Sequence, residues 1–208
     1  MLQLDKAGER LLDSRGRVFL AAERRWEADA SAEPGREVTL PEALSWLQRD
    51  SGTPCRVPIG LIGGREISEA EDALAEEVGF GVAALGLTLI CGGKGGAMAA
   101  ACRGVARAGG TSLGLLPDSD WSAANPYVSI PIATGLGVAR NAVIARASLC
   151  LIAVGGGYGT LSEIAFGLQF GRPVFALSGA PEVEGVRAMA DWAALEPALC
   201  NLVLAIEA

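Results

Sequence analysis

Residues 155–163 read GGGYGTLSE. They follow the apolar stretch ASLCLIAV of residues 147–154 and lead into a helical pattern that runs from Leu161 to Gln169. This order predicts a buried strand, a glycine-rich turn and the start of a helix. Unpaired backbone N–H groups and the positive end of a helix dipole meet at such a turn. The stretch therefore predicts an α/β fold with an anion site, which is most often a site for phosphate.

The end of this stretch has two interpretations. The spacing is neither GxGxxG, because Thr160 occupies the place of the third glycine, nor that of a Walker A loop. Thr160 and Glu163 have the spacing of a capping box, in which the hydroxyl accepts from a backbone amide and the carboxylate reaches back. Glu163 is equally a candidate catalytic carboxylate. The two interpretations are compatible until a partner for Glu163 is found.

Length and composition fit one α/β domain with an attachment. The chain has 208 residues, of which 50% are hydrophobic and 28 are glycine, as suits a parallel sheet buried on both faces. The net charge of −7 argues against a sequence-independent nucleic-acid binder. The sequence contains neither an uncharged apolar stretch of about 18 residues nor a signal-peptide core at its start. We expect a cytoplasmic protein with no membrane or nucleic-acid partner.

The chemistry open to the chain is narrow. It has no histidine, which removes Ser-His and Cys-His nucleophiles and the usual metal ligand. Its 5 cysteines are scattered and form no Cys-x-x-Cys pair, so we interpret them as reduced core thiols and expect no metal site. Lys6 and Lys94 are the lysines. Catalysis would have to use carboxylates, arginines, hydroxyls and backbone dipoles.

The chain divides near residue 55. Residues 1–55 predict a small β-rich attachment, with strands at 2–4, 17–20 and 37–40 and a helix at 41–48. Residues 56–208 predict a Rossmann-like, doubly wound parallel sheet. Its strands are expected at 58–63, 87–91, 111–116, 128–132, 149–154 and 173–177. Its helices are expected at 69–85 (capped by Ser68 with Glu71 at N3), 96–108, 137–147, 160–170 and, interrupted near Pro197, 183–206.

Glycine-rich turns follow three of these strands, at 63–64, 92–96 and 155–159. The carboxyl ends of parallel strands meet at one edge, where such folds bind ligands, so the three turns together favour a phosphate-bearing ligand. Lys94 would add a positive charge there, unless it is a solvated loop residue. Arg140 begins a helix, where a cation opposes the dipole. We therefore expect an anion from outside this helix to stabilise the arginine, either a ligand phosphate or the carboxylate of Glu163.

These motifs carry a family resemblance. Residues 57–178 resemble the LOG-like nucleotide-binding superfamily, often labelled "lysine decarboxylase-like". Its hallmark is Pro-Gly-Gly-x-Gly-Thr-x-x-Glu, preceded fifteen residues earlier by an Arg-Lys pair. Residues 156–163 match the glycines, the threonine and the glutamate, and Arg140 lies fifteen residues before Gly155. Residues 92–98, GGKGGAM, look like the family's other phosphate-side loop.

The chain departs from the hallmark at two positions. Gly155 replaces the proline, and Asn141 replaces the lysine after the arginine. Both departures look more like the branch that includes molybdenum-cofactor carrier proteins, which shares the fold and anion site but has no established phosphoribohydrolase activity. A pyridoxal-phosphate-dependent lysine decarboxylase is not expected, because Lys94 alone lies near a plausible site and occupies a turn suited to phosphate.

These features are compatible with three functions. The first is a protein that binds a phosphorylated ligand, either a nucleotide or the phosphorylated pterin of molybdenum cofactor, and requires no further cofactor. The second is an N-glycosyl hydrolase of nucleoside 5′-monophosphates, in which Arg140 and Glu163 are catalytic and the arginine lowers the pKa of Glu163 to keep it ionised. The third, single-stranded DNA handling, is disfavoured by the acidic charge and the few aromatic residues.

The resemblance also implies a homo-oligomer, either a dimer or a tetramer. The residues predicted to bind the ligand and its phosphate are Gly63, Gly64, Gly92, Gly93, Lys94, Gly95, Gly96, Met98, Asn141, Gly155, Gly156, Gly157, Tyr158, Gly159 and Thr160.

Overall fold

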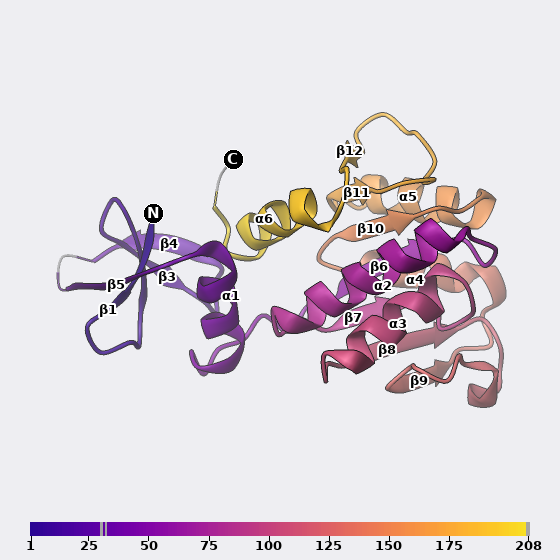
Figure 1. Cartoon of the computed structure of the whole chain (residues 1–208), viewed down its shortest axis with the longest axis horizontal. Helices are drawn as coiled ribbons and strands as arrows, with labels where there is room; N and C mark the ends of the chain where they lie inside the picture. Colours follow the sequence, from indigo (N-terminus) through magenta and orange to yellow (C-terminus); the bar gives the residue numbers. More distant parts are fainter. Residues whose placement is uncertain (30, 32, 207–208) are drawn as a thin grey trace. The chain divides into compact units, whose positions relative to one another are not determined.

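The computed structural model describes residues 1–29, 31 and 33–206, and these form two compact units (Figure 1). One unit comprises Met1–Arg56 together with the chain from Ala194 onward, and the other comprises Val57–Ala193. The last two residues of the predicted second domain, 207 and 208, lie outside the described residues. No helix in the described part of the chain is both long and apolar enough to span a bilayer.

The unit Val57–Ala193 contains a seven-stranded parallel sheet with the order β12-β11-β10-β6-β7-β8-β9. The strand order reverses between β6 and β10, which pair in parallel at the centre of the sheet. This arrangement confirms the predicted Rossmann-like fold. The strands are β6 (Ile59–Gly63), β7 (Leu89–Cys91), β8 (Ser112–Leu116), β9 (Ile130–Ala133), β10 (Leu151–Val154), β11 (Val174–Ala176) and β12 (Arg187–Ala188).

Helices cover both faces of this sheet. The helices α2 (Glu69–Ala84) and α3 (Ala97–Arg107) pack against each other, as do α4 (Arg140–Ala147) and α5 (Tyr158–Gln169). The connections through α2 and α3 run away from β6 in one direction and those through α4 and α5 run in the other, so right-handed crossovers place the two pairs on opposite faces. Each helix predicted between 69 and 170 is found, with its ends displaced by three residues at most.

The core of this unit is apolar and tightly enclosed. Ile62, Leu151 and Ile164 are almost completely shielded from solvent and belong to one cluster between the sheet and its helices. Burying such a side chain contributes about 1.5–3 kcal/mol. The absence of a side chain at Gly63 lets β10 and the start of α3 approach, because a Cβ there would collide with the carbonyl oxygen of Val154 on β10 and with the side chain of Ala97 on α3.

The other unit is built on a five-stranded antiparallel sheet with the order β4-β3-β2-β1-β5, which confirms the predicted β-rich attachment. The strands are β1 (Leu2–Asp5), β2 (Leu11–Asp13), β3 (Arg17–Leu20), β4 (Arg25–Ala28) and β5 (Pro34–Val38). Strands β2 and β4 were not predicted. Strand β2 has only three residues, and β4 is an exposed edge strand with charged side chains, so neither shows a clear alternation of apolar residues.

Helix α1 (Leu40–Arg49) and all but the first two residues of α6 (Trp192–Val203) complete this unit. Helix α1 begins with a capping box formed by Thr39 and Glu42. Helix α6 corrects the prediction of a helical tail over 183–206: it begins later, and Pro197 lies inside it instead of interrupting it. Buried side chains at helical spacing, Leu195, Leu199 and Val203, hold α6 in place across the proline.

Candidate functional site

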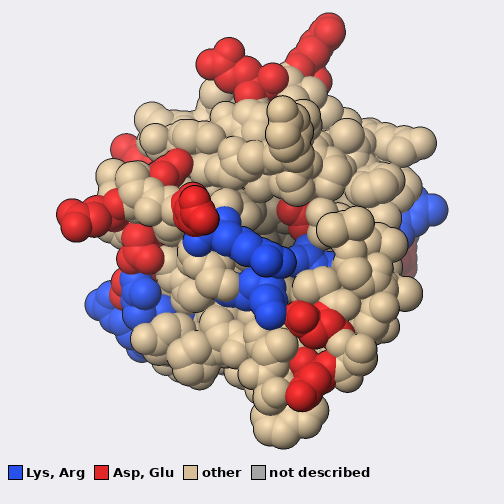
Figure 2. Space-filling model, turned by 90° about the vertical axis from the view of Figure 1, so that its right-hand side faces the viewer, with Lys and Arg blue, Asp and Glu red and all other residues tan. Residues whose placement is uncertain are grey.

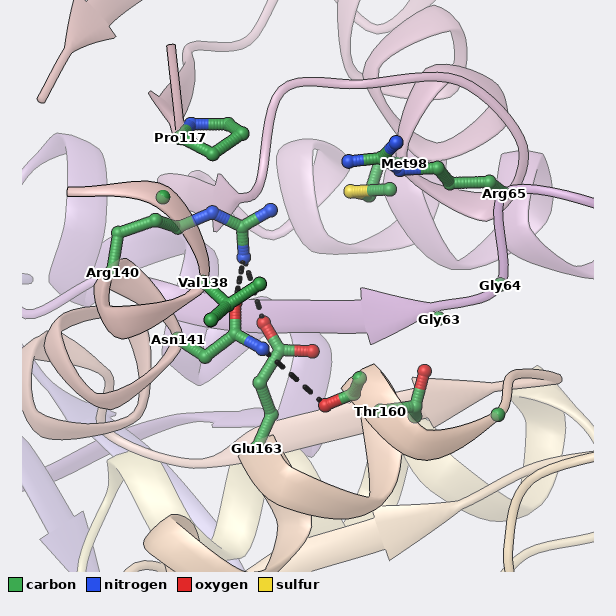
Figure 3. Close-up of a pocket in the computed structure, with 13 residues that line it drawn as sticks. Gly63, Gly64, Arg65, Met98, Pro117, Val138, Arg140, Asn141, Thr160 and Glu163 are labelled. Carbon is green, nitrogen blue, oxygen red and sulfur yellow. Dashed lines mark hydrogen bonds and ion pairs between the residues drawn. The ribbon is translucent and has the colours of Figure 1, made fainter. Parts of the chain in front are cut away.

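A cavity of about 300 Å³ opens at the carboxyl ends of β6 and β10, where the strand order reverses (Figure 3). Ligands of open α/β sheets bind in the crevice at this point. On the face of the molecule shown in Figure 2, basic side chains gather around a hollow although the chain is acidic overall. The residues that line the cavity are Gly63, Gly64, Arg65, Met98, Pro117, Gly137, Val138, Arg140, Asn141, Gly157, Gly159, Thr160 and Glu163.

The N-terminus of α5 forms one wall. The helix begins at Tyr158 with Gly157 as its N-cap, and no side chain caps it. The capping-box interpretation of Thr160 is therefore wrong: the glycines allow the helix to begin two residues earlier than predicted, so Thr160 is its third residue. Gly156 has φ +115°, and a Cβ there would collide with the hydroxyl of Thr160. This turn leaves the first amides of α5 open to an anion.

The partner of Glu163 is Arg140. Arg140 is the first residue of α4, and its Nη1 lies 3.1 Å from Oε1 of Glu163 on the second turn of α5. Both side chains are more than nine-tenths buried, and Figure 3 shows them pointing toward one another. Of the two anions expected for this arginine, the structure supplies the carboxylate.

Asn141 ties the two helices together around this pair. Its Oδ1 accepts a hydrogen bond from Nη1 of Arg140, and its Nδ2 donates to Oγ of Ser162 at 3.1 Å. The amide thus spans from the arginine to the first turns of α5. A lysine, which the LOG hallmark has here, cannot accept a hydrogen bond from the guanidinium.

Burial raises the pKa of Glu163 to about 7, although Arg140 acts in the opposite direction. Arg140 lowers this pKa as expected, but it does not keep the carboxyl fully ionised, because loss of solvation outweighs one ion pair whose arginine is shared with Asn141. Near neutral pH, Glu163 exchanges between a neutral acid and a carboxylate. Such a group can donate or accept a proton inside the cavity.

Arg140 keeps unused hydrogen-bonding capacity. Its Nε is buried and has no hydrogen-bond partner. Its Nη2 lies against Gly92, where a Cβ would collide with it, so the glycine turn after β7 makes room for the guanidinium. A buried donor without an acceptor costs free energy, so the structure keeps this guanidinium in place at a cost.

The structure brings together only part of the predicted set. Seven of the predicted ligand-binding residues line the cavity: Gly63, Gly64, Met98, Asn141, Gly157, Gly159 and Thr160. Lys94 points elsewhere, since its Nζ pairs with Oδ2 of Asp118 at 2.9 Å and donates to the carbonyl of Ala123 at 3.0 Å. The predicted residues that are not among the lining residues are Gly92, Gly93, Lys94, Gly95, Gly96, Gly155, Gly156 and Tyr158.

Sequence reasoning missed four residues of the lining: Arg65, Pro117, Gly137 and Val138. Arg65 directly follows the predicted turn at 63–64, but its position alone does not distinguish it from a solvated loop arginine. Pro117 directly follows β8, and Gly137 and Val138 form a short 3₁₀ helix before α4 (Gly137–Ala139). The helix predicted from residue 137 includes both positions, but the pattern does not indicate that they face a cavity.

Fold and site together define a class: a Rossmann-like protein whose glycine turns and Arg–Glu pair share one cavity at the reversal of the strand order. The chain belongs to the SLOG cluster4 family, whose sequence model matches residues 56–195. The LOG-like resemblance is thereby confirmed.

One protein related in sequence and two solved structures are similar to this chain. An uncharacterized protein of Archaeoglobus fulgidus is 43% identical over 129 residues, which cover 62% of this chain and 85% of that protein. The molybdenum cofactor binding protein of Rippkaea orientalis is 30% identical with a TM-score of 0.67, over 71% of this chain and 98% of that one. The molybdenum cofactor carrier protein of Chlamydomonas reinhardtii is 34% identical with a TM-score of 0.65, over 72% and 99%.

Proposed function

We propose that this protein binds a phosphorylated small molecule in the cavity between β6 and β10, with the phosphate on the N-terminus of α5. The observation that carries the proposal is the uncapped start of α5, with Gly157, Gly159 and Thr160 lining the cavity. Backbone amides and the helix dipole bind phosphate at such a position.

The ligand class that fits best is a molybdenum-cofactor-like pterin phosphate, with a nucleotide as the other candidate. Support comes from the two similar proteins that bind or carry molybdenum cofactor and from the two departures, Gly155 and Asn141, that this chain makes from the LOG hallmark. Binding of the phosphate by backbone amides requires no metal ion held by the protein. Within the described residues, no group of three or more Cys, Asp or Glu side chains is placed to hold one.

Gly157 offers a sharp test, because nothing lies within 4 Å of a Cβ placed there. Gly157→Asp would put a carboxylate at the N-cap of α5, where it accepts from the free amides and stabilises the helix while it repels phosphate. We expect the affinity for inorganic phosphate, measured by calorimetry, to fall about tenfold or more while the protein stays folded.

Gly157→Asn is the matched control, since it caps the helix with a side chain of the same size and no charge. Its loss of affinity should be clearly smaller than that of Gly157→Asp. Equal phosphate binding by the wild type and Gly157→Asp would contradict the proposed site.

A second candidate function rests on the Arg140–Glu163 pair, which faces the same cavity. In this alternative the protein cleaves the N-glycosidic bond of a nucleoside 5′-monophosphate. Glu163 in its ionised form would activate water or stabilise the oxocarbenium-like centre, and Arg140 would hold Glu163 and the ribose phosphate. A pKa of about 7 makes both protonation states available to Glu163 near neutral pH.

A test for catalytic turnover distinguishes the ligand-binding function from the hydrolase function. The protein is incubated with a panel of nucleoside 5′-monophosphates, and free base is measured by chromatography. Base release that Glu163→Gln abolishes would establish the hydrolase and overturn the carrier. Ligand retained without base release, and lost in Gly157→Asp, supports the carrier.

A further inference from the structure

Arg65 is a second cation in the cavity, and the function proposed above gives it no role. It lies in the turn after β6, is exposed, and lines the cavity beside Met98. Figure 3 shows its guanidinium directed across the cavity toward that of Arg140. A long, exposed arginine has many solvated conformations available, so this inward position calls for an electrostatic explanation.

The carboxylates near Arg65 are bonded to other cations. Glu163 is paired with Arg140, and the carboxylate of Asp118 is bonded by Lys94. The positive charge of Arg65 acts on Asp118 through space and helps to lower the pKa of that carboxyl. Within the described residues, however, no side chain accepts a hydrogen bond from Arg65 or forms an ion pair with it.

Two guanidinium groups that share a cavity repel each other. An oxyanion between them would turn this repulsion into two charge-assisted interactions, because the planar fork of arginine matches oxyanion geometry. The hydrogen bonds of Arg140 to Glu163 and Asn141 both come from Nη1, so they do not use its other nitrogen atoms. The start of α5, marked by Thr160 in Figure 3, lies apart from Arg65 and presents a separate anion position.

We propose that the ligand carries two oxyanion groups, one held by the N-terminus of α5 and the other held between Arg65 and Arg140. The inference rests on the proposed binding function and narrows it from any phosphorylated molecule to one with two oxyanion groups, such as a diphosphate. A cavity of about 300 Å³ is at the small end of ligand sites but has room for two linked oxyanion groups.

The test compares inorganic phosphate with pyrophosphate, which isolates the head group from the unidentified organic part. Binding is measured by calorimetry at fixed ionic strength with EDTA present, so that no divalent cation bridges the anions. We expect the wild type to bind pyrophosphate at least about tenfold more tightly than phosphate. In Arg65→Gln this preference is lost, while phosphate affinity changes about threefold or less. Arg65→Lys, which keeps the charge without the fork, is expected to retain part of the preference.

Arg15→Gln is the matched control, because it removes the same charge from an exposed turn of the other unit. It should leave both affinities unchanged. Equal affinity of the wild type for the two anions, or an equal loss for both in Arg65→Gln, would overturn the inference and leave the proposed phosphate site standing. Binding of neither anion would overturn both.

Discussion

Glu163 is subject to two opposing effects on its pKa: burial of its carboxyl and the positive charge of Arg140. Burial dominates, and the pKa rises from 4.5 to about 7. An ion pair in a protein interior does not guarantee ionised partners, because desolvation of each charge can exceed their attraction. The pair therefore has two states of similar free energy at neutral pH, and a bound anion beside it would favour the protonated one.

This residue predicts a specific dependence of stability on pH. The folded pKa lies above the unfolded one, so the folded protein binds the proton more tightly between pH 4.5 and 7. The contribution of Glu163 to the free energy of unfolding is fully present below pH 4.5 and declines as the pH rises to about 7, by on the order of 3 kcal/mol. Urea denaturation of the wild type and Glu163→Gln at several pH values measures the decline as their difference.

The same substitution at exposed Glu182 serves as the control for that measurement, because it removes a surface carboxyl from the same unit. A stability difference between wild type and Glu163→Gln that stays constant from pH 4.5 to pH 7 would show that burial does not dominate.

Individual residues of the site differ in how far the sequence reveals them. The pairing of Arg140 with Glu163 was one of two alternatives open from the sequence, because a cation at a helix start needs an anion that a ligand phosphate could equally supply. The raised pKa could not be predicted, since it depends on how completely neighbouring elements exclude water from Glu163. Arg65 was missed because a single arginine after a glycine turn is indistinguishable from a solvated one until the cavity is known.

At the scale of elements, the capping boxes show why sequence patterns succeed or fail. Ser68 and Glu71 at the start of α2 form the predicted capping box, with Oγ of Ser68 accepting from the amide of Glu71 at 3.3 Å. Thr160 and Glu163 have the same spacing at the start of α5, yet the helix begins at Tyr158. The difference arises from glycines, which allow backbone conformations that the pattern does not encode, and from Arg140, which competes for the carboxylate.

The cap of α2 leads to a prediction about stability. Ser68→Ala removes the side-chain acceptor for the amide of Glu71, and we expect the free energy of unfolding to fall by about 1 kcal/mol. Ser68→Asp, which can also accept this hydrogen bond at an N-cap, should retain most of the stability. Urea denaturation followed by circular dichroism measures both variants. A Ser68→Ala variant as stable as the wild type would mean that solvent replaces the cap without cost.

For the whole molecule, the parallel unit was predictable because buried strands alternate with amphipathic helices at regular spacing. The sequence did not show which segments form the other unit, because the last element of that unit comes from the far end of the chain. Residues from Ala194 onward group with Met1–Arg56. Trp26 on β4 donates from Nε1 to the carbonyl of Leu204 at 2.8 Å, a contact between residues 178 positions apart. Local patterns do not report contacts at such separation.

This grouping predicts that a lesion in α6 weakens the antiparallel unit and spares the ligand site. Leu199 is fully buried on α6, so Leu199→Ala removes core volume and should cost about 2–5 kcal/mol. Hydrogen exchange should then quicken in β1 to β5, while phosphate affinity and the protection of β6 and β10 stay unchanged, because those strands belong to the other unit. Leu202→Ala, at a partly exposed position on the same helix, should cost less. Equal loss of protection in β6 and β10 would instead mean that the two units unfold as one.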